Sequence, residues 1–258
     1  MNVLAIGDVC GKIGVEALLR LLPALKKQYN IGLTIVNGEN SAEGNGIVPQ
    51  SADLIFKAGA DVITGGNHTL RRPEFYSVLE ENPCLLRPAN LPAEVPGKGV
   101  TVVDLGFTRA AVLNLLGVVY LESQACPFQT ADALIAELKK QGIANIFVDF
   151  HAEATSEKRA LGFYLDGKVT AVFGTHTHVA TADACVLPNG TGYITDLGMT
   201  GVEQSVLGVE KEIIIQKMRS KMPVRFKNAA GPAYLNGCVF KVDHKTGKCL
   251  SAQQITVR

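Results

Sequence analysis

Short apolar runs alternate with segments of helical spacing through the first half of the chain. Three of these runs are predicted to be buried strands: residues 3–6, 33–36 and 61–64. Leucines between the first two runs repeat at helical spacing, although Pro23 is expected to kink or split that helix. Two further helices are predicted, one over residues 49–58 with Pro49 in its first turn and one over residues 73–81. Strands and helices that alternate in this way predict right-handed crossovers and a parallel sheet.

The second half of the chain changes character. Residues 100–105 and 110–116 predict a hairpin, and a helix over residues 131–140 is expected to end just before Gly142. The remaining predicted elements are strands at residues 145–150 and 169–173, a hairpin across residues 188–190, a helix at residues 210–221 and two strands around residues 244–247. No linker or internal repeat interrupts the pattern, so we expect a single domain over residues 1–258. The pattern favours an α/β fold in which two mixed sheets pack together with helices outside.

Polar residues come at the ends of five predicted strands. They are Asp8, Glu39, Asn67, His151 and His176. In α/β sheets, groups at the carboxyl ends of strands converge on a shared crevice. Nitrogen and oxygen ligands gathered there predict a divalent metal centre rather than a nucleophile triad.

Several of these positions also have a purely structural interpretation. Taken alone, Asp8 would cap the following helix, and Glu39 with Asn40 would form a turn. A lone His151 is more often a hydrogen-bonded core histidine than a metal ligand.

The segment Gly174-Thr175-His176-Thr177-His178 favours the metal interpretation. Residues two apart on a strand leave it on the same face, so His176 and His178 are expected to lie side by side. Two clustered imidazoles are costly to bury without a shared cation or partner. Two glycines also precede Asn67 and His68, where they allow close approach of the backbone.

A ligand set of this composition would accommodate two cations that share a carboxylate. Two-metal hydrolytic centres hold their ions roughly 3.5–4 Å apart and activate a bridging water for in-line attack at phosphorus. Such a water loses a proton near neutral pH, so a free histidine is left to protonate the leaving oxygen. His68 suits that role because Asn67 can bind metal while its neighbour points elsewhere.

Composition narrows the classes of partner and location. The formal net charge is +1 and aromatic residues make up 6%, so neither duplex nucleic acid nor a membrane is indicated, and RNA has no support from charge. No apolar segment approaches the roughly 20 residues that span a bilayer, and no signal peptide is recognisable. The six scattered cysteines form no CxxC pair, which favours a reduced, cytoplasmic protein. A homo-oligomer is compatible with the sequence.

The ordered motifs resemble those of the calcineurin-like metallophosphoesterases. They are Gly7-Asp8, Gly38-Glu39-Asn40, Gly66-Asn67-His68, His151 and Gly174-Thr175-His176-Thr177-His178. With the segment Asp196-Leu197-Gly198-Met199-Thr200-Gly201, the chain is similar over its whole length to the YmdB-like branch of bacterial 2′,3′-cyclic nucleotide phosphodiesterases. The resemblance implies a four-layer α/β/β/α metallophosphoesterase sandwich, with a dinuclear site that commonly holds iron or manganese.

The same resemblance implies a role for each site residue. One metal would be held by Asp8, Asn40 and His178. The other would be held by Asn67, His151 and His176. Glu39 would bridge the two metals, and His68 would be the proton donor. The segment at residues 196–201 is expected to line the pocket.

Three positions depart from the broader superfamily. Its first motif usually reads Asp-x-His, whereas Cys10 occupies the histidine position here. Glu39 replaces the bridging Asp, and Thr69 replaces an acidic residue after Asn-His. The first two changes alter ligand type and reach, which leaves the identity of the metal open. Cys10 is expected to be a small buried hydrophobe rather than a thiolate ligand.

These residues predict a dinuclear-metal-dependent phosphodiesterase. Its small-molecule substrate would be a cyclic nucleotide of the 2′,3′-cAMP or 2′,3′-cGMP class, opened by a metal-bridging hydroxide with His68 as proton donor. One alternative is a phosphomonoesterase or phosphoprotein phosphatase on the same centre, with Arg71 or Arg72 donating hydrogen bonds to the substrate phosphate. The other is a non-catalytic regulatory protein in which the metal centre is structural.

Overall fold

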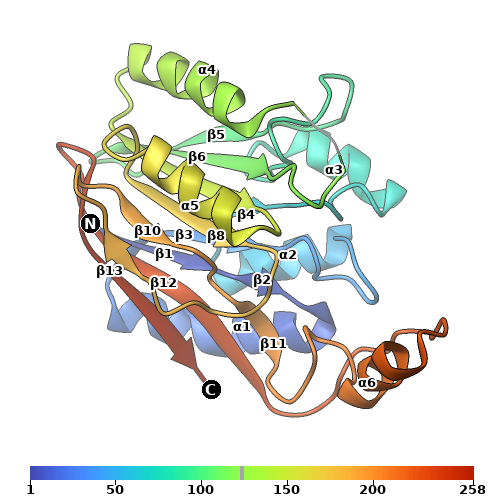
Figure 1. Ribbon diagram of the computed structural model, residues 1–258. Coiled ribbons are helices and arrows are strands. Elements are labelled where there is room, and N and C mark those ends of the chain that lie inside the picture. The colour runs from blue at the N-terminus through green and yellow to red at the C-terminus, as the bar shows by residue number, and fades with distance from the viewer. Residues whose placement is uncertain (123–124) are drawn as a thin grey trace.

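Two β-sheets lie face to face at the centre of the computed structural model, which describes residues 1–122 and 125–258 (Figure 1). The first sheet has seven strands in the order β2-β11-β12-β1-β3-β4, with β13 paired to β12. The second sheet has six strands in the order β5-β6-β7-β8-β10-β9. Each sheet contains both parallel and antiparallel neighbours, which confirms the predicted pair of mixed sheets.

Three parallel strands form one half of the first sheet, as the alternating pattern predicts. The strands of this sheet are β1 (Asn2–Ile6), β2 (Asp8–Val9), β3 (Ile31–Asn37), β4 (Val62–Thr64), β11 (Met199–Val202), β12 (Ala233–Asp243) and β13 (Lys248–Val257). Its outer face is covered by α1 (Gly11–Gln28), α2 (Pro49–Ala58), the 3₁₀ turn η1 (Pro73–Phe75) and α3 (Tyr76–Glu81). The predicted helices at residues 49–58 and 73–81 are therefore confirmed.

The second sheet has four consecutive parallel strands, β6, β7, β8 and β10. Its strands are β5 (Val100–Asp104), β6 (Arg109–Leu116), β7 (Asn145–His151), β8 (Ala171–Thr175), β9 (Cys185–Val186) and β10 (Gly192–Ile194). The outer face is covered by α4 (Pro127–Lys140) and α5 (Thr155–Tyr164).

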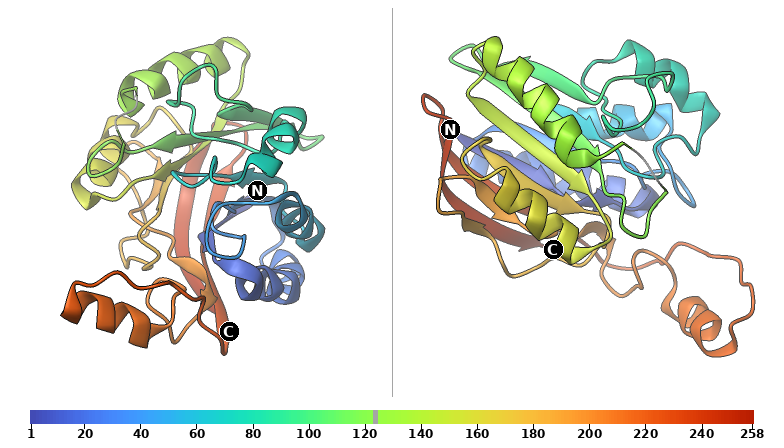
Figure 2. Two further views of the ribbon diagram at one scale, coloured as in Figure 1. Left: turned by 90° about the vertical axis from the view of Figure 1, so that its right-hand side faces the viewer. Right: turned by 45° about the horizontal axis from the view of Figure 1, so that its top comes forward.

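Alternation along β1 shows how the sequence builds the layers. Leu4 and Ile6 pack outward against the α1 and α2 side of the first sheet. Val3 and Ala5 point the other way, into the apolar cluster shared with Phe147 of the second sheet. The result is a four-layer α/β/β/α sandwich, with helices on the two outer faces (Figure 2).

Two helices differ from what the sequence pattern indicates. Helix α1 runs through Pro23 without splitting, because Pro23 is exposed while Leu18 and Leu22 bury the opposite face against the sheet. Helix α5 has no amphipathic signal in the sequence, because its burial is inverted: Lys158 is buried and Phe163 is exposed.

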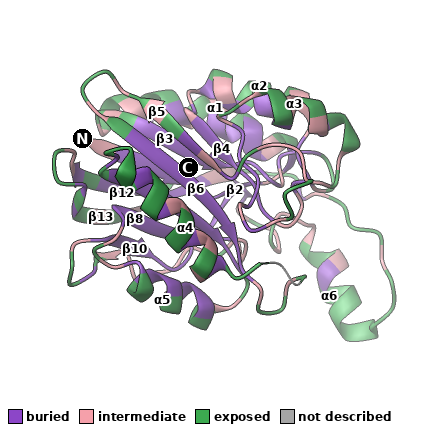
Figure 3. Ribbon diagram, turned by 90° about the horizontal axis from the view of Figure 1, so that it is seen from above, coloured by how far each residue is buried: buried purple, intermediate pink, exposed green. Residues whose placement is uncertain are grey.

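A segment between β11 and β12, residues 203–232, leaves the sandwich and carries the predicted helix α6 (Lys211–Ser220). We call this segment the excursion. Helix α6 stands away from the body of the molecule, and its surface is mostly exposed (Figure 3). Among the described residues, no helix has both the length and the apolar character needed to cross a bilayer.

Candidate metal centre

The carboxyl ends of strands from both sheets meet at one place. Asp8 and Glu39 follow β1 and β3 of the first sheet, and Asn67 follows β4. His151 is the last residue of β7 in the second sheet, and His176 comes directly after β8. The structure therefore brings together the ends of five strands, as the sequence pattern predicts.

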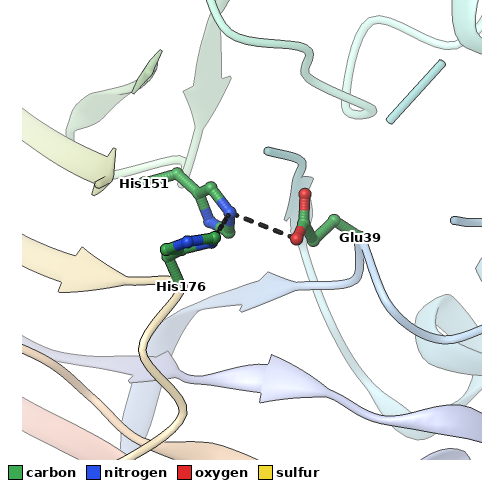
Figure 4. Close-up of side chains that lie close together, drawn as sticks. All are labelled: Glu39, His151 and His176. Atoms are coloured by element: carbon green, nitrogen blue, oxygen red, sulfur yellow. Dashed lines mark hydrogen bonds and ion pairs between the residues drawn. The ribbon is translucent and has the colours of Figure 1, made fainter. Parts of the chain in front are cut away.

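One ring nitrogen lies at the centre of the cluster (Figure 4). His151 Nε2 is 3.1 Å from Glu39 Oε1, 3.0 Å from Asn67 Oδ1 and 3.1 Å from His176 Nδ1. Glu39, His151 and His176 each offer a ligand atom, and these atoms all lie within 4.8 Å of one another. A single nitrogen cannot satisfy three such neighbours with one proton or one lone pair.

A second group of ligand atoms lies beside the first. His178 Nε2 is 3.6 Å from Asp8 Oδ1 and 3.3 Å from Asn40 Nδ2. Asn40 Nδ2 also donates to Glu39 Oε1 at 3.0 Å, so the Glu39 carboxylate contacts both groups. Asn40 turns its nitrogen, rather than its oxygen, toward His178 in this arrangement.

Each imidazole of the cluster is held from outside through its other nitrogen. His151 Nδ1 lies 2.9 Å from Thr175 Oγ1, and His176 Nε2 lies 2.8 Å from Glu153 Oε2. His178 Nδ1 lies 3.3 Å from the carbonyl oxygen of Leu207. Such an outer acceptor fixes the tautomer of a metal-ligating histidine and leaves the inner nitrogen free of a proton.

A buried network behind His151 is missed by the sequence pattern. Thr175 Oγ1 donates to Asp149 Oδ1 at 2.7 Å, so the oxygen of this hydroxyl can accept a hydrogen bond from His151 Nδ1. Asp149 also accepts hydrogen bonds from Asn37 and Thr64. The sequence feature that could have indicated this network is Asp149, a carboxylate within the mostly apolar run at residues 145–150.

Electrostatics keep both buried carboxylates ionised. Burial raises the pKa of Glu39, but the His151 and His68 imidazoles outweigh burial and hold that pKa well below its usual range. Burial likewise raises the pKa of Asp8, and His178 and His151 bring it below its usual value. Burial and the neighbouring His151 lower the pKa of His176, which favours its neutral, ligating form.

A separate observation indicates that this group of side chains fits divalent cations. Asp8 is fully buried, yet its Oδ1 atom has no hydrogen-bond partner among the described residues. An ionised oxygen that accepts no hydrogen bond is costly to bury, and a coordinated cation would offset that cost. Carboxylate, amide and imidazole groups are ligands that zinc, manganese and iron accept.

The geometry of His176 and His178 differs from the predicted strand face. Both lie beyond the end of β8 and have positive φ, 99° and 64°, which is uncommon for residues other than glycine. They consequently face different partners, His176 toward His151 and His178 toward Asp8. Asp196 Oδ2 holds the turn between them, because it accepts from both the backbone N and the Oγ1 of Thr177.

The other structural interpretations also have outcomes. Asp8 lies in β2 and is not the helix cap, since the N-cap of α1 is Cys10, which makes no capping bond. Cys10 is half-buried, with Sγ 3.6 Å from His178 Nδ1, so it packs behind a proposed ligand. Arg72 donates hydrogen bonds to the carbonyl oxygens of residues 43 and 45, so its guanidinium group stabilises that loop.

Gly66 shows why the Asn67-His68 turn begins with glycine. A Cβ atom at this position would lie 2.2 Å from Glu39 Oε2 and 2.4 Å from His151 Nε2. Only a residue without a side chain therefore allows the backbone this close to the ligand set.

A cavity of about 690 Å³ opens on one side of the cluster. Its wall includes Glu39, Asn40, His68 and the two histidines after β8, together with part of the excursion. The segment at residues 196–201 does not contribute to this wall, contrary to expectation, because it is buried beneath the turn that it supports.

A four-layer sandwich with nitrogen and oxygen ligands at facing strand ends defines the calcineurin-like metallophosphoesterase class. Residues 4–255 match the family model described as YmdB-like protein. The chain belongs to this YmdB-like family. It is 46% identical to a 2′,3′-cyclic-nucleotide 2′-phosphodiesterase from Bacillus subtilis, over 100% of this chain and 97% of that protein.

Two solved structures are similar over nearly their whole length. One is a novel phosphatase from Mycoplasma pneumoniae, with a TM-score of 0.93 and 36% identity over 100% of this chain and 93% of that one. The other is a hypothetical protein from Thermus thermophilus, with a TM-score of 0.93 and 38% identity over 99% of this chain and 98% of that one.

Proposed function

We propose that the protein hydrolyses 2′,3′-cyclic nucleotides at a dinuclear metal centre. Family membership and relatives named as a phosphodiesterase and a phosphatase make the chain a phosphoric ester hydrolase. The 46% identical Bacillus subtilis relative is named as a 2′,3′-cyclic-nucleotide 2′-phosphodiesterase, which favours the cyclic diester. The observation that carries the proposal is the set of three imidazoles, each anchored from outside. Their inner nitrogens face Glu39 for His151, Asp8 for His178 and the His151 ring for His176.

The two groups of ligand atoms suggest how the metals are held. Asn67, His151 and His176 would hold one ion, because their ligand atoms converge on one point. Asp8, Asn40 and His178 would hold the other. Glu39 would bridge them, since its carboxylate contacts both groups. We propose iron, with manganese as the alternative, on the resemblance to the calcineurin-like class.

Bound metal ions supply positive charge that activates a water and neutralises the phosphate. The protein then has to deliver a proton to the departing oxygen. During hydrolysis the water oxygen bonds to phosphorus, the bond from phosphorus to the ribose O2′ breaks, and O2′ takes up a proton. The product is a nucleoside 3′-phosphate.

His68 would donate that proton. Its Nδ1 lies 3.0 Å from Asn40 Oδ1, and its backbone N donates to Glu39 Oε2 at 2.9 Å. The ring is a quarter exposed and lines the cavity, in contrast to the fully buried His151. In this proposal Nε2 donates to the substrate, because Asn40 and Glu39 contact the other ring nitrogen, Nδ1.

All six cysteines, each among the described residues, are free. We therefore place the reaction in the reducing environment of the cytoplasm. The organisation of residues 1–258 as one domain stays a prediction.

The test is a substrate panel on protein reconstituted anaerobically with Fe²⁺ or Mn²⁺ at measured stoichiometry. The panel contains 2′,3′-cAMP, 2′,3′-cGMP, 3′,5′-cAMP and an aryl phosphate monoester. We expect the 2′,3′ rings to be opened with the highest kcat/KM and to yield 3′-nucleotides. A preference for the monoester would favour the phosphatase alternative. No turnover of any ester by metal-loaded protein would favour the regulatory one.

A further inference from the structure

The cavity beside the ligand set has two walls of different chemistry. One wall carries Glu39, His68 and the histidines of the proposed metal centre. Another part of the wall comes from the excursion and includes Lys217, Met218, Lys221 and Phe226. A volume of about 690 Å³ lies within the range of sites that enclose ligands larger than a phosphate group, roughly 300–1,000 Å³.

Two lysines on the excursion wall lack an anionic partner. Neither Lys217 nor Lys221 forms an ion pair with a carboxylate among the described residues, whereas nearby Lys227 pairs with Glu210 at 2.7 Å. Lys217 Nζ instead lies 4.5 Å from the centroid of the Phe226 ring. The excursion as a whole carries six Lys or Arg residues and three Glu. Positive charge is therefore concentrated here, although the net charge of the chain is only +1.

The excursion is fixed relative to the proposed metal ligands. His178 Nδ1 donates to the carbonyl oxygen of Leu207, which has a left-handed φ of 55° in the turn before α6. Asn228 Nδ2 donates to Glu43 Oε2 at 3.1 Å and ties the other end of the excursion to the loop after Glu39. Both ends of the excursion are thereby tied to the body of the molecule beside the ligand set.

Charge complementarity then limits the kind of substrate. A 2′,3′-cyclic mononucleotide carries one negative charge, and that charge belongs to the phosphate that must reach the ligand set. Nothing in such a molecule matches two cations on the excursion wall. A nucleotide that continues through its 5′ oxygen brings a second phosphate, and an ammonium group binds phosphate as a point charge.

We propose that the substrate class is an oligonucleotide whose 3′ end carries a 2′,3′-cyclic phosphate. Lys217 and Lys221 bind the phosphate on the 5′ side of the terminal nucleoside, and Phe226 with Met218 packs against that nucleoside. This inference rests on the proposed function, because it uses the same reacting phosphate and the same ligand set.

The experiment compares three substrates on the metal-loaded protein: a 2′,3′-cyclic mononucleotide, the same molecule with a 5′-phosphate, and a dinucleotide with a cyclic 3′ end. The measured quantity is the ratio of kcat/KM for each extended substrate to that for the mononucleotide. We expect the dinucleotide ratio to exceed one and to fall roughly tenfold in Lys217→Ala and in Lys221→Ala, as loss of a charge-assisted contact implies. Lys211→Ala is the matched control, because Lys211 is exposed on α6 and does not line the cavity.

The three arms give separable outcomes. A dinucleotide ratio of one or less, or a ratio that neither lysine variant lowers, overturns the proposal while leaving the proposed function intact. If kcat/KM rises for the 5′-phosphorylated mononucleotide but not for the dinucleotide, the lysines bind a terminal phosphate. That result also overturns the oligonucleotide proposal. Binding of a fluorescent dinucleotide with an uncleavable 3′-phosphate provides a second readout, and we expect its Kd to rise in both lysine variants. Failure of all three substrates to react would instead contradict the proposed function.

Discussion

Histidine side chains at the ligand set differ in what holds them. His151 is fully buried, with contacts to both ring nitrogens, whereas the His68 side chain is a quarter exposed and lines the cavity. A side chain held on both sides can ligate but cannot reach a substrate, so only a partly exposed histidine suits proton transfer.

Replacement of His68 by alanine tests that division of roles. We expect kcat to fall by about 10²- to 10⁴-fold, the usual contribution of a positioned acid, while the protein keeps its full metal content. Turnover of 2′,3′-cAMP and elemental analysis on the same preparation check both parts. His244→Ala serves as the control, because His244 lies in the distant β12–β13 turn. Loss of metal in His68→Ala would instead make His68 a ligand.

Gly66 offers a test of the ligand set that removes no ligand. The Cβ of Gly66→Ala would collide with Glu39 Oε2 and His151 Nε2, so we expect metal affinity and activity to drop together. The fall in affinity should be tenfold or more, about 1.4 kcal/mol. Gly32→Ala is the matched control, since its Cβ would meet nothing closer than 3.8 Å. Full metal occupancy in Gly66→Ala would show that the two ligands do not need their observed positions.

At this scale the sequence indicates residues that the structure brings together, but not the groups that support them. Asp8, Glu39 and His176 are accessible to sequence reasoning because each follows a recognisable apolar run. Thr175 and Leu207 are not, because a hydroxyl or a backbone carbonyl becomes a histidine anchor only through the tertiary path of the chain.

Among the elements, α5 matters most for the turn that carries His176 and His178. Its Lys158 is buried and donates from Nζ to Asp196 Oδ2 at 2.6 Å, and the same oxygen holds Thr177. The helix therefore reaches the site through one buried ion pair. Its inverted burial also explains why hydrophobic periodicity predicts β1, β3 and α2 but not α5.

Removal of this cation should destabilise the fold strongly. We expect Lys158→Met to lower the free energy of unfolding by about 3–5 kcal/mol, because it leaves the buried Asp196 carboxylate without its counter-charge. Lys168→Met is the control: its pair with Asp132 is exposed, and loss of such a pair costs under about 1 kcal/mol. Urea denaturation of the two variants provides the comparison. Equal losses would mean that Asp196 does not depend on Lys158.

At the scale of the whole molecule, the ligand set joins the two sheets. Asp8 and Glu39 come from the first sheet, whereas His151 and His176 come from the second. The sequence predicts this meeting of strand ends from the pattern of runs alone. It does not predict the excursion wall of the cavity, because α6 reaches it from an excursion that the sandwich does not require.

Metal removal should therefore weaken the contact between the sheets. Two buried, ionised carboxylates lose their compensating cations, and a ligand present at 100 times its Kd contributes about 2.7 kcal/mol of stability. For a chain of this size that corresponds to a fall in Tm of roughly 5–10 °C after chelation, measured by scanning calorimetry. Re-addition of Mn²⁺ should restore the transition, whereas Gly66→Ala should respond less to both treatments, because its ligands are displaced. An unchanged Tm in the chelated wild-type protein would mean that the buried carboxylates are compensated by the histidines alone, and the dinuclear centre would lose its structural support.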